Sequence, residues 1–100
     1  MTSMEAINIA KVAMQKFFTD VYNLKIDAKY SDIEESRNAA VKAIMDFAKV
    51  KKQNHEKLNE YEKKALGTFD AANLMLMTKL HMTEEELFGG ENCGGNESCM

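Results

Sequence analysis

The sequence predicts an all-α fold, a small up-down-up bundle of three helices with a short C-terminal helical turn and a flexible tail. Proline is absent from the 100 residues, and only one of the five glycines precedes Gly89. The β-branched residues form no alternating runs, which are typical of strands, and proline and glycine are the residues that helices tolerate least. The hydrophobic fraction of 45% and the charged fraction of 29% are ordinary for a globular protein and argue against disorder.

The first helix is expected from about residue 4 to about residue 25. Thr2-Ser3-Met4-Glu5 matches a capping box, in which a threonine oxygen and a glutamate carboxylate accept hydrogen bonds from free backbone N–H groups at a helix start. Apolar residues then recur at alternating steps of three and four, the spacing of a coiled-coil seam. They are Ile7, Ala10, Met14, Phe17, Val21 and Leu24.

The second helix is expected to follow a connection at Lys25 to Tyr30. Ser31-Asp32-Ile33-Glu34 matches a second capping box directly ahead of a periodic segment. The spacing places Arg37 at the edge of the apolar stripe, where the stripe turns toward solvent. The residues expected on the buried face are Ile33, Ala40, Val41, Ile44, Phe47 and Ala48.

Residues 51–57 contain no apolar side chain. Either the chain turns there, with Asn54 as a cap residue, or one long helix continues from Ser31 to Leu80. We favour the turn, because a compact bundle of three helices buries both flanking apolar stripes, whereas the long helix needs an oligomer to do so.

The third helix, expected from about His55 to Leu80, carries the main functional hypothesis. Its apolar stripe begins at Leu58 and widens at the run Leu74-Met75-Leu76-Met77, which is apolar in most directions around the axis. A helix that is apolar all round is expected to be buried all round. At 1.5 Å per residue this helix is ~39 Å long and the first is ~33 Å long, so its methionine-rich end is expected to project beyond its neighbours.

Two sequence features predict changes in the helix pattern within the C-terminal third of the chain. Gly67-Thr68 predicts a kink, a point of close packing or the start of a fresh helix. Thr83 with Glu86 predicts a capping box for a short helix that ends at Gly89-Gly90. We therefore expect a single helical domain at residues 1–88 and a flexible Gly/Asn-rich acidic tail at residues 89–100, since no basic residue follows Lys79.

The sequence gives little support for catalysis or metal binding. It has no nucleophile elbow, phosphate-binding glycine loop or H-E-x-x-H spacing, so we expect no enzyme and no cofactor. Zinc sites use four ligands, commonly as two C-x-x-C pairs, whereas Cys93 and Cys99 lie in the tail and His55 and His81 have no ligand spacing. A disulfide between the two cysteines is the alternative to exposed thiols without a role.

The leading hypothesis is a small cytoplasmic protein-interaction module, an adaptor, inhibitor or assembly factor that self-associates through an apolar helix face. Methionine is flexible and polarisable and is frequent on surfaces that accept partners. The alternative is that these same side chains form only the core. The expected interface residues are Phe18, Tyr22, Leu74, Met75, Met77 and Leu80.

A second hypothesis is a bundle that sequesters a small anionic molecule such as a nucleotide at Lys51, Lys52 and Lys57. Acidic residues dilute this basic patch, and a solvated helix face is the alternative interpretation. A net charge of −3 gives no overall attraction to nucleic acid, so a DNA-associated regulator is the weakest hypothesis. No apolar run approaches the ~20 residues that span a bilayer, and the N-terminus lacks the order of a signal peptide. A cytoplasmic protein is therefore expected.

Overall fold

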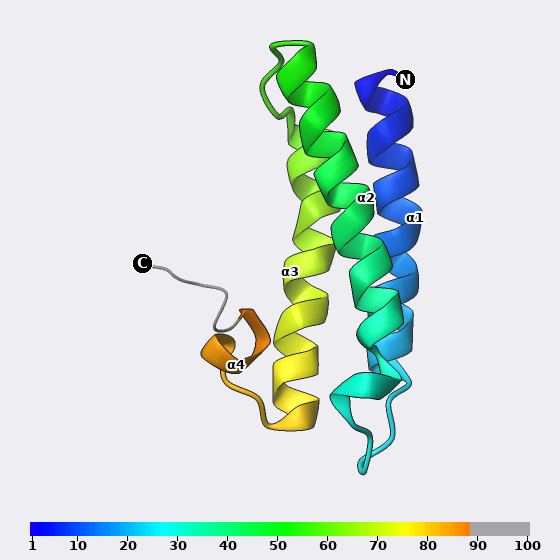
Figure 1. The fold of residues 1–100 in the computed structure, drawn as a ribbon, viewed down its shortest axis with the longest axis vertical. Helices are drawn as coiled ribbons and strands as arrows, with labels where there is room; N and C mark the ends of the chain where they lie inside the picture. Colours follow the sequence, from blue (N-terminus) through cyan, green and yellow to red (C-terminus); the bar gives the residue numbers. More distant parts are fainter. Residues whose placement is uncertain (89–100) are drawn as a thin grey trace.

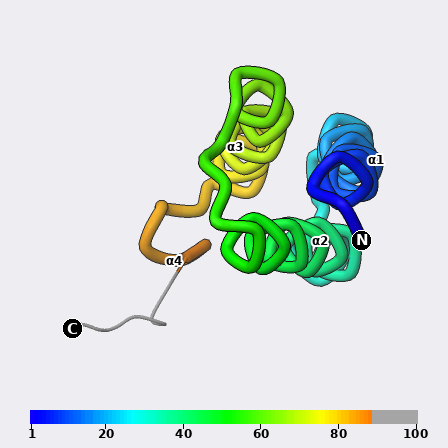
Figure 2. The backbone as a smooth tube through the Cα atoms, turned by 90° about the horizontal axis from the view of Figure 1, so that it is seen from above, coloured from blue at the N-terminus to red at the C-terminus, as the bar shows by residue number. Residues whose placement is uncertain are grey.

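Three long helices alternate in direction in the computed structural model, which describes residues 1–88; in the view of Figure 1 they run down, up and down. Viewed along the bundle they lie at the corners of a triangle, and a short fourth helix lies on the side away from the first (Figure 2). The predicted all-α bundle is confirmed, whereas the predicted tail, with Cys93 and Cys99, lies outside the described residues. The elements are α1 (Ser3–Tyr22), the 3-10 turn η1 (Tyr30–Asp32), α2 (Glu34–Gln53), α3 (Glu60–Leu80) and α4 (Glu84–Phe88).

Capping boxes start three of the four helices. At α1 the Thr2 hydroxyl accepts from the Glu5 N–H at 3.1 Å, and the Glu5 carboxylate accepts from the Thr2 N–H at 2.8 Å. The same reciprocal pair forms between Thr83 and Glu86 at α4. Both of these boxes were predicted from the sequence, and a third, from Asn59, starts α3. Capping thus sets the helix starts by satisfying N–H groups that have no partner within the helix.

The predicted capping box at Ser31 to Glu34 is wrong. The residue that precedes α2 is Ile33, whose side chain is buried and caps nothing. The Asp32 carboxylate instead accepts from the Lys29 N–H at 2.9 Å and tightens η1. Burial of a whole isoleucine side chain contributes ~2 kcal/mol to stability, more than the ~1 kcal/mol of a typical N-cap hydrogen bond. An apolar residue therefore occupies the N-cap position of α2.

Both histidines end a helix. His55, just after α2, and His81, just after α3, have φ of 54° and 55°, the left-handed conformation that commonly closes helices. The Glu56 N–H then bonds the Lys51 carbonyl at 3.0 Å, and the Met82 N–H bonds the Met77 carbonyl at 2.9 Å. The favoured turn at residues 51–57 is confirmed, with Asn54 at the end of α2 as predicted.

The core lies along α1, which packs closely on both other long helices. The first five predicted stripe residues of α1 are fully buried, although the helix ends at Tyr22 rather than near residue 25. On α2 the stripe is narrower than predicted: Val41 and Ile44 are half-buried, and Ala48 is exposed. The fully or nearly fully buried side chains of α2 and α3 include Ala40, Phe47, Ala65, Ala72 and Leu76.

The predicted excess length of the third helix is wrong. Because α3 starts at Glu60 and not near His55, it has 21 residues against 20 in α1. Leu58 lies in the preceding loop and is 42% exposed. The methionine-rich end is also covered in part within the chain: Leu76 is buried, and the half-buried side chains that pack against the core there are Met75, Met77, Leu80 and Met82.

The helix continues without interruption through Gly67. No side chain or foreign backbone lies within 4 Å of the position that a Cβ at Gly67 would occupy, so close packing does not explain this glycine. The alternative that a fresh helix starts at Thr68 is also wrong.

Candidate functional site

α2 and α3 stand farther apart than either does from α1, and long side chains bridge the gap between them. Near the end of α2 the buried Lys51 ammonium lies 2.9 Å from a carboxylate oxygen of Glu62 and 3.7 Å from one of Glu56. Burial by itself raises the pKa of Glu62. The hydrogen bond from the Asn59 N–H and the contact with Lys51 outweigh that effect, so the pKa of Glu62 is lowered.

Near the start of α2, toward the opposite end of the helix, Arg37 forms the second bridge. Its Nε donates to the Asn73 side-chain oxygen at 3.1 Å, and its Nη1 donates to the Tyr30 hydroxyl at 3.4 Å. The guanidinium carbon lies 5.8 Å from the ring centre of Phe69 and 5.4 Å from that of Phe88, within cation–π range of both. Since Phe88 belongs to α4, the same arginine also holds the short helix against α2 and α3.

Between the two bridges lies an open apolar hollow of about 330 Å³, which we call the α2/α3 groove. Met45 is 56% exposed there. Phe69 lines the groove, and its ring centre lies 5.6 Å from that of the core residue Phe17, with the two rings tilted by 42°. Apolar side chains from two helices thus surround one opening that the chain does not fill. The lining residues are Val41, Ile44, Met45, Leu66, Phe69 and Asp70.

Of the six residues expected to form an interface, two lie on α1 and four on α3. Phe18 lines a hollow of about 680 Å³ between α1 and α3. Tyr22 is 66% exposed, and the Lys79 ammonium lies 5.5 Å from its ring centre. Leu74 is 63% exposed, whereas Met75, Met77 and Leu80 are half-buried against the core.

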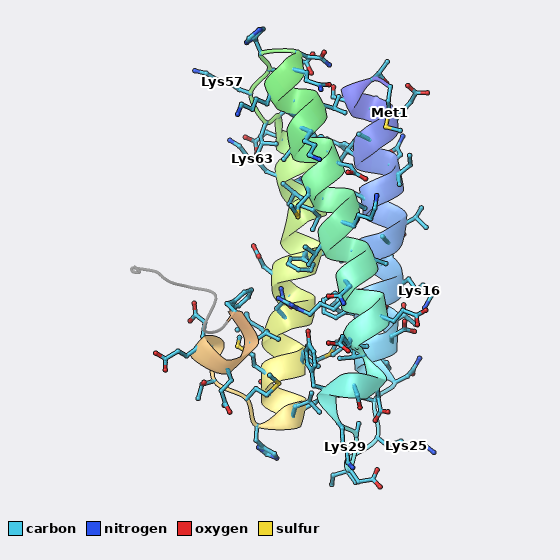
Figure 3. The ribbon with its side chains drawn as sticks, in the orientation of Figure 1. Met1, Lys16, Lys25, Lys29, Lys57 and Lys63 are labelled. Carbon is cyan, nitrogen blue, oxygen red and sulfur yellow. The ribbon has the colours of Figure 1, made fainter. Side chains whose placement is uncertain are left out.

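The three lysines expected to bind an anion do not form one site. Lys51 is buried between two carboxylates, which already neutralise its charge. Lys52 is exposed, and Lys57 is exposed in the loop beyond α2, where Figure 3 shows it pointing away from the bundle. The ammonium of Lys51 is therefore already used within the fold, and anion binding at these lysines stays a prediction.

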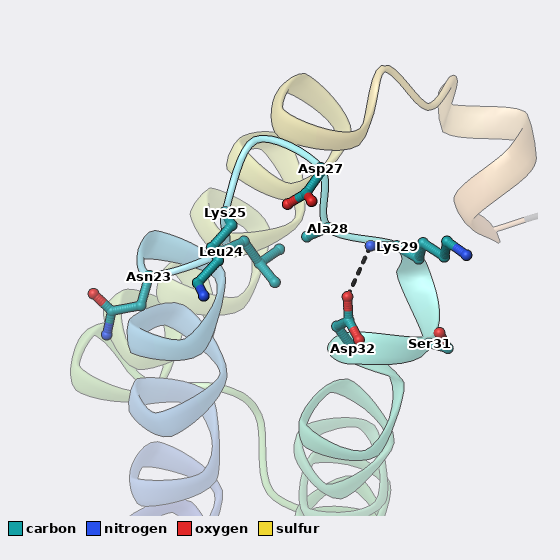
Figure 4. A pocket seen from close by; sticks show the side chains of 8 residues that line it. All are labelled: Asn23, Leu24, Lys25, Asp27, Ala28, Lys29, Ser31 and Asp32. Carbon is teal, nitrogen blue, oxygen red and sulfur yellow. Dashed lines mark hydrogen bonds between the residues drawn. The ribbon is translucent and has the colours of Figure 1, made fainter.

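The loop between α1 and α2 contains another hollow, of about 630 Å³, shown in Figure 4. Its lining mixes two lysines and two aspartates with small and apolar residues. Asp32 is already bonded to the Lys29 N–H, and the Lys29 side chain points out of the hollow (Figure 4). Lining of both charge signs, without a buried polar group that faces inward, does not define a ligand site.

Within residues 1–88 no cluster of three or more histidine, cysteine, aspartate or glutamate side chains is arranged to hold a metal ion. Among the described helices, none combines the length and the apolar character that a membrane crossing requires.

Sequence reasoning missed the α2/α3 groove and both of its bridges. The sequence pattern places Val41 and Ile44 on the buried face of the second helix and predicts no role for Met45. The available signal was Met45, an apolar residue outside the buried stripe of α2. The pairing of Lys51 with Glu62 had no local signal, because the two residues lie on different helices.

Comparison of the chain with protein-family models, with curated proteins and with solved structures found no match in any of the three. The α2/α3 groove is therefore interpreted from its own chemistry.

Proposed function

We propose that this chain is a small protein-interaction module that self-associates through the α2/α3 groove. The observation that supports the proposal is the apolar opening between two helices that polar bridges hold apart at both ends. Burial of apolar surface is the main favourable term in most protein association, and a helix laid into a groove between two helices is a common way to achieve it.

The groove is a stronger candidate than the other exposed apolar residues. Ile9 and Val12 project from α1 and Leu74 projects from α3, but these side chains lie outside the hollows described above. Single exposed apolar residues are normal on protein surfaces. In the groove, by contrast, α2 and α3 contribute apolar side chains to one continuous lining.

The test is the solution mass across a dilution series, measured by light scattering. We expect the mass of the wild-type protein to rise with concentration. Met45→Glu should return it to the monomer mass, because association would bury an unpaired carboxylate in an apolar contact. Leu74→Glu is the matched control: Leu74 is similarly exposed, at 63% against 56% for Met45, and belongs to the surface that the sequence favoured.

Two results contradict the proposal. A monomer mass at every concentration of the wild-type protein excludes self-association. Loss of association in Leu74→Glu, with association retained in Met45→Glu, places the contact on α3 and excludes the groove. Circular dichroism of both variants verifies that the helices are intact.

A further inference from the structure

The solvent-facing side of α2 carries a strip of six residues at steps of four, three, four, three and four, which we call the outer strip. This is the spacing of a coiled-coil seam. Its two central members, Val41 and Met45, also line the α2/α3 groove. Val41 is half-buried and the other five are exposed. The six residues are Glu34, Asn38, Val41, Met45, Ala48 and Lys52.

The outer strip has ends of opposite charge. Glu34 lies in the first turn of α2 and Lys52 in its last turn, and the middle of the strip is apolar. Glu34 and Lys52 are each nine residues from Ala43, Asn38 and Ala48 are each five residues away, and Val41 and Met45 are each two residues away. The six residues are therefore placed symmetrically in the sequence about Ala43, and the two end residues carry opposite charges.

We infer that a second copy of this chain packs its α2 antiparallel on this strip, about a two-fold axis that passes between Val41 and Met45 at the level of Ala43. In that register Glu34 faces the partner's Lys52 and Val41 faces the partner's Met45, and the symmetry repeats each contact. A parallel arrangement would instead place Glu34 against Glu34 and Lys52 against Lys52, which repel. The antiparallel arrangement also opposes the two helix dipoles favourably.

The same register would cover the groove. Because Val41 and Met45 belong to both the strip and the groove, a helix on the strip also lies over the opening toward Leu66. The Lys42–Asp46 pair, at 3.0 Å, belongs to α2 but not to the strip and can remain as it is. A second copy thus covers the apolar middle of the strip and places an opposite charge against each of its two charged ends.

This inference rests on the proposed self-association. Charge-reversal variants test the antiparallel register separately from self-association itself. Glu34→Lys or Lys52→Glu alone should each weaken the dimer about tenfold at low salt, since two ion pairs become two repulsions. The double variant Glu34→Lys/Lys52→Glu should recover the wild-type dissociation constant, because the pairs re-form with exchanged signs. High salt should reduce these differences. The dissociation constants are measured by sedimentation equilibrium.

Asp27→Lys and Lys25→Glu are matched controls, because they make the same charge changes in the loop between α1 and α2 and should not affect the dimer. Damage to folding cannot imitate the expected result, since the double variant carries both substitutions and still associates. If the wild-type dimer forms but neither single reversal weakens it, or the double variant fails to recover, the antiparallel register is wrong and the proposed function stands. Absence of a wild-type dimer overturns both.

Discussion

The ion pair between Lys51 and Glu62 is almost completely removed from solvent, with side-chain exposures of 10% and 3%. Two buried charges lose their hydration, so such a pair contributes little by itself, but removal of one partner leaves the other charge uncompensated and is costly. Glu62 is held further by the Asn59 N–H. At the residue scale, the fold therefore depends on both partners being present rather than on a large net attraction.

Glu62→Gln should lower the free energy of unfolding by about 3 kcal/mol at neutral pH. The folded state lowers the pKa of Glu62 below its unfolded value of ~4.3. The stability that this carboxylate contributes is thus present above the unfolded pKa and is lost as pH falls through the folded pKa. Urea unfolding from about pH 7 to about pH 3 should show a smaller acid-induced loss in Glu62→Gln than in the wild type.

The double variant Lys51→Met/Glu62→Leu is the control for this prediction. It replaces the pair with apolar side chains of similar size, so it should recover most of the stability that Glu62→Gln loses. A double variant as unstable as Glu62→Gln would show that the two residues do not act as a pair.

At the scale of the helices, local sequence predicted most of the architecture. The caps at Thr2 and Thr83 lie where the sequence places them, because capping acts within four residues. The start of α2 was not predicted correctly, since burial of Ile33 in the tertiary core outweighs a local cap. The predicted start of α3 is too early, because Leu58 continues the helical apolar spacing backward; the capping box of Asn59 and Glu62 is the sequence signal that marks the true start.

Gly67→Ala should raise the free energy of unfolding by about 1 kcal/mol, because a glycine inside an exposed helix costs conformational entropy. The site has room for the added methyl group. Thermal and urea unfolding measure the change. Ala71→Gly, one turn later on the same exposed side of α3, should lower the stability by a similar amount, and an unchanged or lower stability in Gly67→Ala would show that the glycine has a packing role.

At the scale of the whole molecule, α4 folds back on the bundle and joins its core. Leu87 is 6% exposed and belongs to the same apolar cluster as the buried residues of the three long helices. Phe88 is 42% exposed and contacts Arg37. The candidate groove could not be predicted from the sequence, because the separation of α2 from α3 depends on contacts between residues far apart in the chain, such as Arg37 with Asn73.

Leu87→Ala should lower the free energy of unfolding by about 2 kcal/mol, through lost burial and the cavity that remains. Phe88→Ala should cost less, since its ring is partly in solvent already. Urea unfolding followed by circular dichroism measures both. Equal effects of the two substitutions, or no effect of Leu87→Ala, would contradict the packing of α4 as part of the core.

The two bridges across the bundle both use long cationic side chains, Lys51 and Arg37, that reach polar groups on α3. The length of these two side chains therefore sets the distance between α2 and α3. Shorter apolar residues in both places would allow the helices to close into a sealed three-helix core. The opening in this bundle is therefore adjustable at two positions, without any change in topology.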